Sequence, residues 1–352
     1  MAQRVTIKEI AEELGLSTAT VSNVIHGKTK KISEKTIKKV QEKLEESGYI
    51  PNMAAVLLAQ NSSKIVCVVL SDDPKYEGKM LEDPFVSKMI GGISKELDRI
   101  GYFMMLKEEK DIKQIVRYAS MWNMAGLILI GYCAMDYEKL RGQMHIPFAV
   151  VDAYTSEVLQ YSDVGVDNIR GGRLAGEYLI EMGHRKIMYV SDNDEDCDHD
   201  RYIGLCQAFE ESCAEDKVKA GSYHINFYKI SEKKQGRDNN YACLKNHLSE
   251  YTAAFCASDA YAIELMSYLQ KEGLSIPEDF SIIGFDDIPL ASYVTPGLTT
   301  ISQNVEGRAR KAVDLLREMM EENSPGKTVL FPVELVERGS VKRLENREKQ
   351  DQ

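Results

Sequence analysis

The sequence predicts an α/β protein: an all-α helix-turn-helix head followed by a larger body built on parallel sheets. Helical spacing of apolar residues and a glycine stop, both within the first 25 residues, indicate the head. The body is indicated by short apolar runs that alternate with helical stretches from residue 64 onward. Such alternation is typical of parallel sheets covered by helices on both faces. With 352 residues, the chain can form two or three domains.

The first helix of the head has a recognisable beginning and end. Thr6 and Glu9 form a T-x-x-E capping box, in which the threonine hydroxyl accepts the Glu9 amide hydrogen and the glutamate reaches back. Gly15 ends the helix, because glycine enters the left-handed conformation without steric cost. Between these signals, one face carries apolar residues at helical spacing: Ile7, Ile10, Ala11 and Leu14.

A second helix follows a short turn, with Ser17 as its expected cap. Its inward face carries Val21, Val24 and Ile25. Its outward face consists of small and mostly hydrogen-bonding residues, namely Thr18, Ala19, Ser22 and Asn23. Such a face suits contact with base edges in a major groove, and helix-turn-helix is a recurrent DNA-binding pattern. A helical hairpin in an ordinary bundle is the alternative at this point.

A third helix is expected from Glu34 to about Ser47, capped by Ser33 and ended by Gly48. Pro51 then breaks the chain and can open a new helix over residues 52–60. That segment has only about two turns, too few to be stable alone in water. DNA together with a second copy of the chain is one candidate for what orders it.

The charge is divided unevenly along the chain. The formal net charge is −11, but residues 1–63 carry nine basic and seven acidic side chains, a net of +2. The remainder carries −13. Six lysines follow the second helix, where they could meet phosphates: Lys28, Lys30, Lys31, Lys35, Lys38 and Lys39. DNA would repel the acidic body, which confines contact to the head.

Several classes of protein have no support in the sequence. The seven cysteines are scattered and never form a C-x-x-C pair, which favours reduced thiols in a cytosol over a disulfide frame or zinc ribbon. No apolar run approaches a membrane span, and the first residues lack the apolar core of an export signal, so a cytoplasmic protein without membrane association is expected. Dinucleotide, Walker and nucleophile-elbow motifs are missing, so we expect neither an enzyme nor a cofactor or metal.

The body offers seven strand candidates, each a short apolar run: residues 64–71, 102–107, 126–130, 147–152, 186–191, 253–258 and 280–286. Helical patterns cover residues 86–100, 168–182, 201–213, 259–272 and 304–320. Parallel sheets bind ligands at the carboxyl ends of their strands. Several of these ends carry a carboxylate or hydroxyl: Ser71, Asp72, Asp152, Ser191, Asp192, Ser258, Asp259, Asp286 and Asp287. A helix cap would explain any one of the aspartates by itself.

The head resembles the DNA-binding domain of the LacI/GalR family of bacterial repressors through VTIKEIAEELGLSTATVSNVIHG (5–27) and GYIPNMAAVLLAQNSS (48–63). The body resembles the same family through residues 164–191 and 276–303, and RGS (338–340) looks like the family's final strand. The resemblance covers almost the whole chain. It implies a helix-turn-helix domain (1–50), a hinge helix with linker (51–63), a two-lobed, periplasmic-binding-protein-like body (64–340) and a charged tail (341–352). The lobes would comprise about 64–164 with 300–324, and 165–298 with 325–340.

For the head, the resemblance implies one role for each group of residues. The readers of the major groove would be Thr18, Ala19, Ser22 and Asn23, with Thr20 nearer a phosphate. Leu58 would wedge into the minor groove and kink the duplex, with Ala55 packed beside it.

For the body, the resemblance implies a small effector clamped between the lobes. Arg201 and Asp286 would be the main polar clamps, and Phe85 would offer an apolar face. The lining would be completed by Asp152, Asp167 and Ser258. Arg and Asp can each engage a vicinal diol with two hydrogen bonds, so a carbohydrate is the expected effector.

One acidic stretch, residues 192–200, suggests a calcium loop at first sight. Counted from Asp192, however, Cys197 stands where an EF-hand needs glycine, and Ile203 where it needs glutamate. A solvated acidic loop is the expected state. Because it runs into Arg201, we hypothesise that it disfavours phosphorylated effectors.

These patterns predict an effector-controlled transcriptional repressor that binds a palindromic operator as a homodimer. The ligand would bias lobe closure and thereby the affinity for DNA. Alternatives are a regulator of the same family controlled by a protein corepressor, and a sugar-active enzyme on the same body. Tetramers of the family need an apolar heptad tail, so the charged end predicts a dimer.

Overall fold

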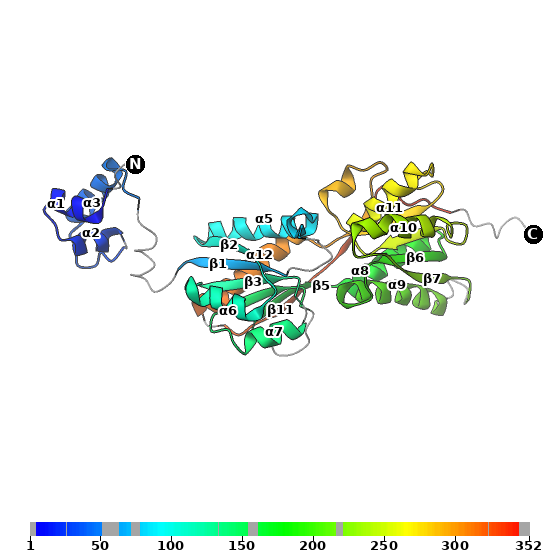
Figure 1. Ribbon diagram of the computed structural model, residues 1–352, viewed down its shortest axis with the longest axis horizontal. Helices are drawn as coiled ribbons and strands as arrows, with labels where there is room; N and C mark the ends of the chain where they lie inside the picture. Colours follow the sequence, from blue (N-terminus) through cyan, green and yellow to red (C-terminus); the bar gives the residue numbers. More distant parts are fainter. Residues whose placement is uncertain are drawn as a thin grey trace, which may run out of the picture. The chain divides into compact units, whose positions relative to one another are not determined.

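The computed structural model describes residues 5–25, 27–50, 63–71, 78–132, 134–153, 161–215, 221–322 and 324–344. The chain divides into two units, Met1–Lys64 and Ile65–Gln352 (Figure 1). The expected hinge segment, residues 51–62, lies outside the described residues, and so do residues 345–352.

The head consists of three helices: α1 (Ile7–Leu14), α2 (Thr18–Ile25) and α3 (Glu34–Glu46). The predicted capping box is confirmed, since Thr6 Oγ1 accepts the Glu9 amide and Glu9 Oε2 accepts the Thr6 amide at 2.7 Å. Gly15 ends α1 in the left-handed conformation at φ 66°. The helices share a small buried core made by Ile10, Ala11, Val21, Val24 and Val40. The head therefore has the three helices and the caps that its sequence predicted.

The first lobe of the body is built on a parallel six-stranded sheet of order β11-β5-β4-β3-β1-β2. Its strands are β1 (Ile65–Leu70), β2 (Phe103–Glu108), β3 (Gly126–Ile130), β4 (Phe148–Val151), β5 (Ser162–Val166) and β11 (Thr328–Phe331). Val68 on β1 pairs with Leu106 on β2 and Ile128 on β3. Its central strands β1, β3 and β4 are apolar and almost entirely buried, as expected in a sheet covered on both faces.

Helices cover both faces of this first sheet. One face packs against α5 (Pro84–Arg99) and α12 (Val305–Glu322), and the other against α6 (Ile112–Met121) and α7 (Ala134–Arg141). A 3-10 turn, η2 (Met80–Glu82), precedes α5.

The second lobe has a six-stranded sheet of order β12-β10-β9-β8-β6-β7. Its strands are β6 (Lys186–Ser191), β7 (His224–Lys229), β8 (Ala253–Cys256), β9 (Ser281–Asp286), β10 (Thr299–Ser302) and β12 (Glu334–Val336), with β12 antiparallel to β10. Its faces are covered by α8 (Asn168–Glu181) with α9 (Asp196–Ala214), and by α10 (Lys234–Lys245) with α11 (Asp259–Lys271). A 3-10 turn, η3 (Pro289–Ser292), follows β9.

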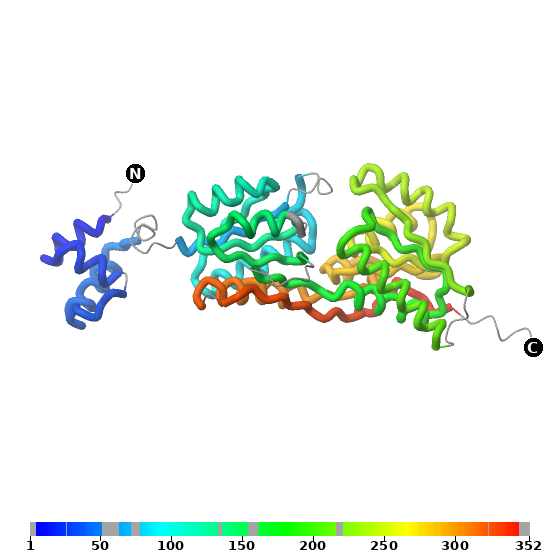
Figure 2. The backbone as a smooth tube through the Cα atoms, turned by 90° about the horizontal axis from the view of Figure 1, so that it is seen from below, coloured from blue at the N-terminus to red at the C-terminus, as the bar shows by residue number. Residues whose placement is uncertain are grey.

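The two lobes are joined by three crossover segments within the described part of the body: between β5 and α8, between β10 and α12, and between β11 and β12. Figure 2 follows these connections as green, orange and red tube. The predicted lobe boundaries need correction here. Residues 299–302 belong to the second sheet, and residues 328–331 belong to the first. Strand pairing determines which lobe each segment belongs to, because β10 pairs with β9 and β11 pairs with β5.

The C-terminal region also differs from the prediction. The final strand is β12, and the predicted strand residues 338–340 follow it as irregular chain with a bend at Gly339 and Ser340, where Ser340 Oγ donates to the Ile282 carbonyl. Residues 341–344, expected in a charged tail, pack against the second lobe. Val341 is buried, and the Leu344 amide donates to the Met182 carbonyl at 2.8 Å.

Several elements were not predicted: β5, β7, β10, β11, β12, α6, α7 and α10. Among the described residues, no helix combines the length and apolar character needed to cross a membrane.

Candidate nucleic-acid interface and ligand cleft

The outward face of α2 is built by the caps and core of the head. Ser17 caps the helix, as predicted: its Oγ accepts the Thr20 amide at 3.1 Å. Burial of Val21 and Val24 turns the opposite face outward, where Thr18, Ala19 and Asn23 are exposed and Thr20 and Ser22 are half-buried. The Thr20 hydroxyl lies 2.9 Å from the Ser17 hydroxyl. The five predicted contact residues of the head thus share one accessible helix.

The lysines that follow α2 supply positive charge to the head. All six of the predicted phosphate contacts are exposed: Lys28, Lys30, Lys31, Lys35, Lys38 and Lys39. Lys43 differs from them, because its ammonium group pairs with Glu13 at 2.6 Å and ties α3 to α1. Ala55 and Leu58, the predicted minor-groove contacts, lie outside the described residues.

The main cleft of the body has a volume of about 630 Å³ and is lined by residues of both lobes. It lies at the carboxyl ends of the strands, as the sequence predicted for parallel sheets. Five predicted effector residues meet in its lining: Phe85, Asp152, Arg201, Ser258 and Asp286.

Arg201 is held rigidly in the wall of the cleft. It is buried on α9, and its Nε donates to Asn168 Oδ1 at 2.9 Å while Nη1 donates to the Ala257 carbonyl at 2.5 Å. Its Nη1 also pairs with Asp198 at 3.5 Å. A close approach of helices α8 and α9 sets this position, because a Cβ on Gly172 would lie 1.9 Å from the Arg201 carbonyl oxygen.

A chain of hydrogen bonds links the two lobes along the wall of the cleft. Gln303 Nε2 donates to Asp286 Oδ1 at 2.5 Å, and Arg308 Nη1 donates to Gln303 Oε1. The other end of the Arg308 guanidinium donates to Asp152 Oδ1 and to the Val164 carbonyl. Asp286 on β9 of the second lobe is thereby connected to Asp152 at the end of β4 in the first.

The backbone at both ends of this chain is in an uncommon conformation. Asp152 has φ 63° and Asp286 has φ 121°, both in the region that L side chains rarely adopt. Such residues cost roughly 1–3 kcal/mol each and cluster at functional sites. Burial is the largest cause that raises the pKa of Asp286 well above its ordinary value; Asp259 and Asp83 act in the same direction, and Arg201 opposes them.

Asp167, a predicted effector residue, is not among the residues that line the cleft. Its side chain is exposed and caps α8, with Oδ1 accepting the Arg170 amide at 2.9 Å. The carboxylates of Asp259 and Asp287 also serve structural contacts. Asp259 accepts the Ile288 amide and the Thr300 hydroxyl, and Asp287 pairs with Arg338 at 2.6 Å. Asp72 lies outside the described residues.

The expected solvated loop at residues 192–200 is instead partly helical and partly buried. α9 begins at Asp196, five residues before the predicted start, and Asp192 and Asp198 are both buried. Asp198 accepts from Ser191 Oγ at 2.6 Å and from the Asn193 amide group, which offsets its burial. Carboxylates in the first turn of a helix are also stabilised by the helix dipole.

Sequence reasoning missed several residues of the cleft lining: Met80, Asp83, Tyr132, Asn193, Glu232, Arg237, Tyr261 and Gln303. Asp83 carried a detectable signal, since Asp-Pro is a common helix start and Asp83 caps α5 through the Val86 amide at 3.0 Å. Arg237 and Tyr261 lie on helices α10 and α11, where no local pattern distinguishes cleft from surface.

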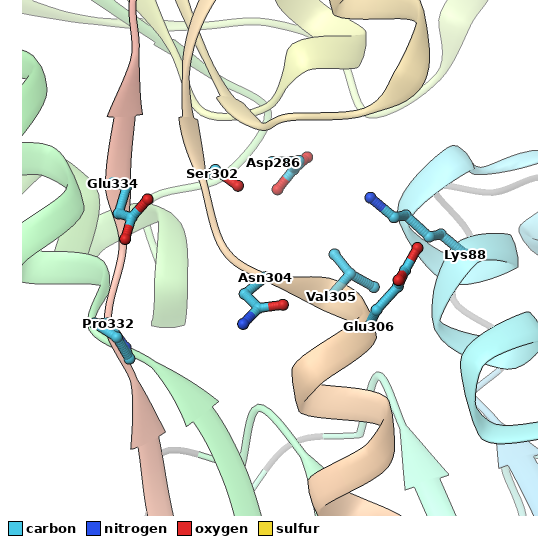
Figure 3. A pocket seen from close by; sticks show the side chains of 8 residues that line it. All are labelled: Lys88, Asp286, Ser302, Asn304, Val305, Glu306, Pro332 and Glu334. Atoms are coloured by element: carbon cyan, nitrogen blue, oxygen red, sulfur yellow. The ribbon is translucent and has the colours of Figure 1, made fainter. Parts of the chain in front are cut away.

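A second, smaller cavity of about 390 Å³ lies beside the crossover segments. Figure 3 shows Lys88 and Glu306 facing Asp286, Ser302 and Glu334 around it, with Asn304 between them. Asp286 lines both cavities. Across the described residues, no group of three or more His, Cys, Asp or Glu side chains is placed to hold a metal ion.

Comparison with known proteins identifies the relatives of both parts of the chain. A sequence signature described as "Bacterial regulatory proteins, lacI family" matches residues 6–52, and one described as "Periplasmic binding protein-like domain" matches residues 177–341. The HTH-type transcriptional repressor PurR of Vibrio campbellii is 31% identical and that of Vibrio atlanticus 30%; each match covers 96% of this chain and 99% of the relative. The chain belongs to the LacI family.

Solved structures agree with this membership. The Lac repressor dimer bound to operator and the anti-inducer ONPF has a TM-score of 0.80 at 23% identity, covering 97% of this chain and 100% of that one. A LacI family transcriptional regulator from Enterococcus faecium with bound ribose has a TM-score of 0.67 at 27% identity, covering 80% and 100%. This LacI-family protein is therefore an effector-controlled, DNA-binding transcriptional regulator with a two-lobed, periplasmic-binding-protein-like body.

Proposed function

We propose that this LacI-family regulator is a dimeric repressor whose affinity for a palindromic operator is set by a carbohydrate effector in the cleft. The repressor acts in the cytoplasm, where its DNA target lies, and it acts by binding without catalysis. The proposal rests on one observation: side chains from both lobes line a single cleft. The first lobe contributes Phe85 and Asp152, and the second contributes Arg201, Ser258 and Asp286.

This arrangement suits a ligand with several hydroxyl groups. A carboxylate can accept hydrogen bonds from two neighbouring hydroxyl groups, and a guanidinium group can donate hydrogen bonds to two. An aromatic ring can pack against the apolar face of a sugar ring. The volume of about 630 Å³ falls within the range of small-molecule pockets. The relative from Enterococcus faecium, solved with bound ribose, supports the same class of ligand.

A ligand that touches both lobes binds one arrangement of the lobes better than others, and this difference is the source of allosteric control. We propose that the lobe arrangement reaches DNA through residues 51–63, where two hinge helices pair and insert Leu58, with Ala55 beside it, into the minor groove. The outward face of α2 then reads the major groove of each half-site, through Thr18, Ala19, Thr20, Ser22 and Asn23. A protein corepressor is the less favoured alternative.

Selection from random DNA followed by titration of carbohydrates tests this proposal. We expect a two-fold symmetric site to be enriched, and at least one carbohydrate to change the affinity of the full-length protein for it. Recovery of no symmetric site would contradict the repressor function. A protein that binds its operator but responds to no carbohydrate would contradict the effector class alone.

Leu58→Ala provides a narrower test of the hinge. We expect specific operator binding to weaken by roughly tenfold or more, while effector binding and non-specific DNA binding persist, because the wedge contributes only when the duplex is kinked. Unchanged operator affinity would remove the wedge assignment.

A further inference from the structure

The cleft carries a large excess of negative charge in its described lining. Eight carboxylate groups but only two guanidinium groups line it, a formal net charge of −6. Carboxylates only accept hydrogen bonds, whereas each sugar hydroxyl both donates and accepts. Asp152 already pairs with Arg308 and Asp198 with Arg201, but the described lining remains acidic, and a neutral carbohydrate supplies no positive charge to balance it. A ligand that is rich in donors, and positively charged, matches it better.

Both arginines of the lining are already compensated within the protein. Arg237 donates to the two carboxylate oxygens of Glu264 at 2.6 and 3.0 Å. Arg201 pairs with Asp198 and donates to Asn168 and to the Ala257 carbonyl. Neither guanidinium offers an uncompensated charge to an anionic ligand, so the described lining favours a phosphorylated effector less than a cationic one.

Two of the carboxylates belong to opposite lobes and oppose each other. Asp83 caps α5 in the first lobe, and Asp286 ends β9 in the second. Both side chains line the same cleft. The charge of Asp83 adds, after burial and Asp259, to the causes that raise the pKa of Asp286. Repulsion between these carboxylates penalises a closed, empty cleft. A ligand cation between them would remove the penalty and supply hydrogen-bond donors to both.

Aromatic side chains complete the same wall. Phe85, Tyr132 and Tyr261 all line the cleft. Their rings offer packing surfaces for the apolar face of a sugar and an additional attraction for an ammonium group.

We propose that the effector is an amino sugar or a similar amino polyol, whose ammonium group lies between Asp83 and Asp286. This inference rests on the proposed function, because it specifies the chemical class of ligand for the same cleft.

Calorimetric titration of the full-length protein at pH 7 tests it with matched ligands: D-glucose, D-galactose and D-mannose, their 2-amino-2-deoxy analogues, and their 6-phosphates. We expect at least one amino sugar to bind about tenfold or more tightly than its parent, and each phosphate to bind more weakly than its parent. At high salt we expect a smaller difference in affinity between the amino sugar and its parent, because salt screens the partly exposed charges.

Asp83→Asn is the informative variant, because asparagine can still cap α5 through the Val86 amide. We expect it to weaken binding of the amino sugar about tenfold more than binding of the parent sugar, because only the amine carries a charge that the lost carboxylate would balance. Asp111→Asn is the matched control. Asp111 caps α6 through the Lys113 amide and is absent from the described cleft lining.

Each outcome of these titrations decides between the two proposals. Parent sugars that bind as tightly as their amino analogues, or phosphates that bind most tightly, overturn the amino-sugar inference and leave the carbohydrate effector intact. Equal effects of Asp83→Asn and Asp111→Asn overturn the assignment of Asp83. Binding of none of these sugars in any form overturns the carbohydrate effector itself.

Discussion

The guanidinium of Arg201 lies over the ring of Phe285, with 3.7 Å between Cζ and the ring centroid. Phe285 immediately precedes Asp286 on β9, so this contact fixes the two principal polar side chains of the cleft relative to each other. Asn168 and the Ala257 carbonyl hold the same guanidinium through hydrogen bonds. The clamp is thus organised before a ligand arrives, which reduces the entropic cost of binding.

Replacing Arg201 by lysine should weaken effector binding by at least tenfold, or about 1.4 kcal/mol. Lysine keeps the charge but can neither stack flat on Phe285 nor donate from a planar fork. Calorimetry measures the change. Arg173→Lys is the control, because Arg173 on α8 is partly exposed and pairs with Glu177 and Glu211. Wild-type effector affinity in Arg201→Lys would contradict the role of Arg201 as a clamp.

Gly204→Ala should lower the free energy of unfolding by about 3 kcal/mol, at the upper end of overpacking effects. A Cβ at this position would lie 2.0 Å from the Ile169 carbonyl oxygen, so α8 and α9 would have to separate. Gly91→Ala on α5 is the control. Nothing lies within 4 Å of its added Cβ, so helix propensity should raise stability by roughly 0.5–1 kcal/mol. Urea unfolding compares the two, and an equal effect of both would refute the close packing of α8 against α9.

Arg308→Met should destabilise the body by about 3 kcal/mol or more, because it leaves the partners of a buried cation uncompensated. Arg308 is fully buried and pairs with Asp152, whereas Arg310 on the same helix is 64% exposed and pairs with Glu96. Arg310→Met should therefore change stability by no more than about 1 kcal/mol. Thermal and urea unfolding distinguish these results. A loss of stability in Arg308→Met that is no larger than the small loss expected for Arg310→Met would show that the link from Asp152 to Gln303 contributes little to stability.

His184 should make the protein less stable as the pH falls from about 6.5 to about 4. Burial lowers the pKa of His184 to about 4, although its hydrogen bond to the Lys342 carbonyl opposes this effect. In that window the unfolded state binds the extra proton and the folded state does not, so stability is lost on acidification. The loss attributable to this group is about 3 kcal/mol. Urea unfolding at pH 7 and pH 5 should show a smaller difference for His184→Gln than for the wild type, and an unchanged difference would contradict this.

Local interactions explain what the sequence predicted well. The capping box of Thr6 and Glu9, the turn at Gly15 and the Ser17 cap involve residues within one or two turns of each other, so their types determine the geometry. Apolar runs similarly marked the buried strands β1, β3 and β9. Strand β7 escaped detection because it is an edge strand whose residues are only half-buried or exposed, which leaves no apolar run.

By itself, the sequence predicted a helix-turn-helix head and a body with parallel sheets. Its family resemblance added six candidates for a single cleft: Phe85, Asp152, Asp167, Arg201, Ser258 and Asp286. Only the tertiary structure decided that Asp167 caps a helix, that Asp83 lines the cleft, and that β10 and β11 belong to opposite sheets. The physical reason is that a cap, a glycine turn or an apolar strand depends on neighbours along the chain. The partner of an aspartate or of a short strand depends on residues that folding brings together from distant parts of it.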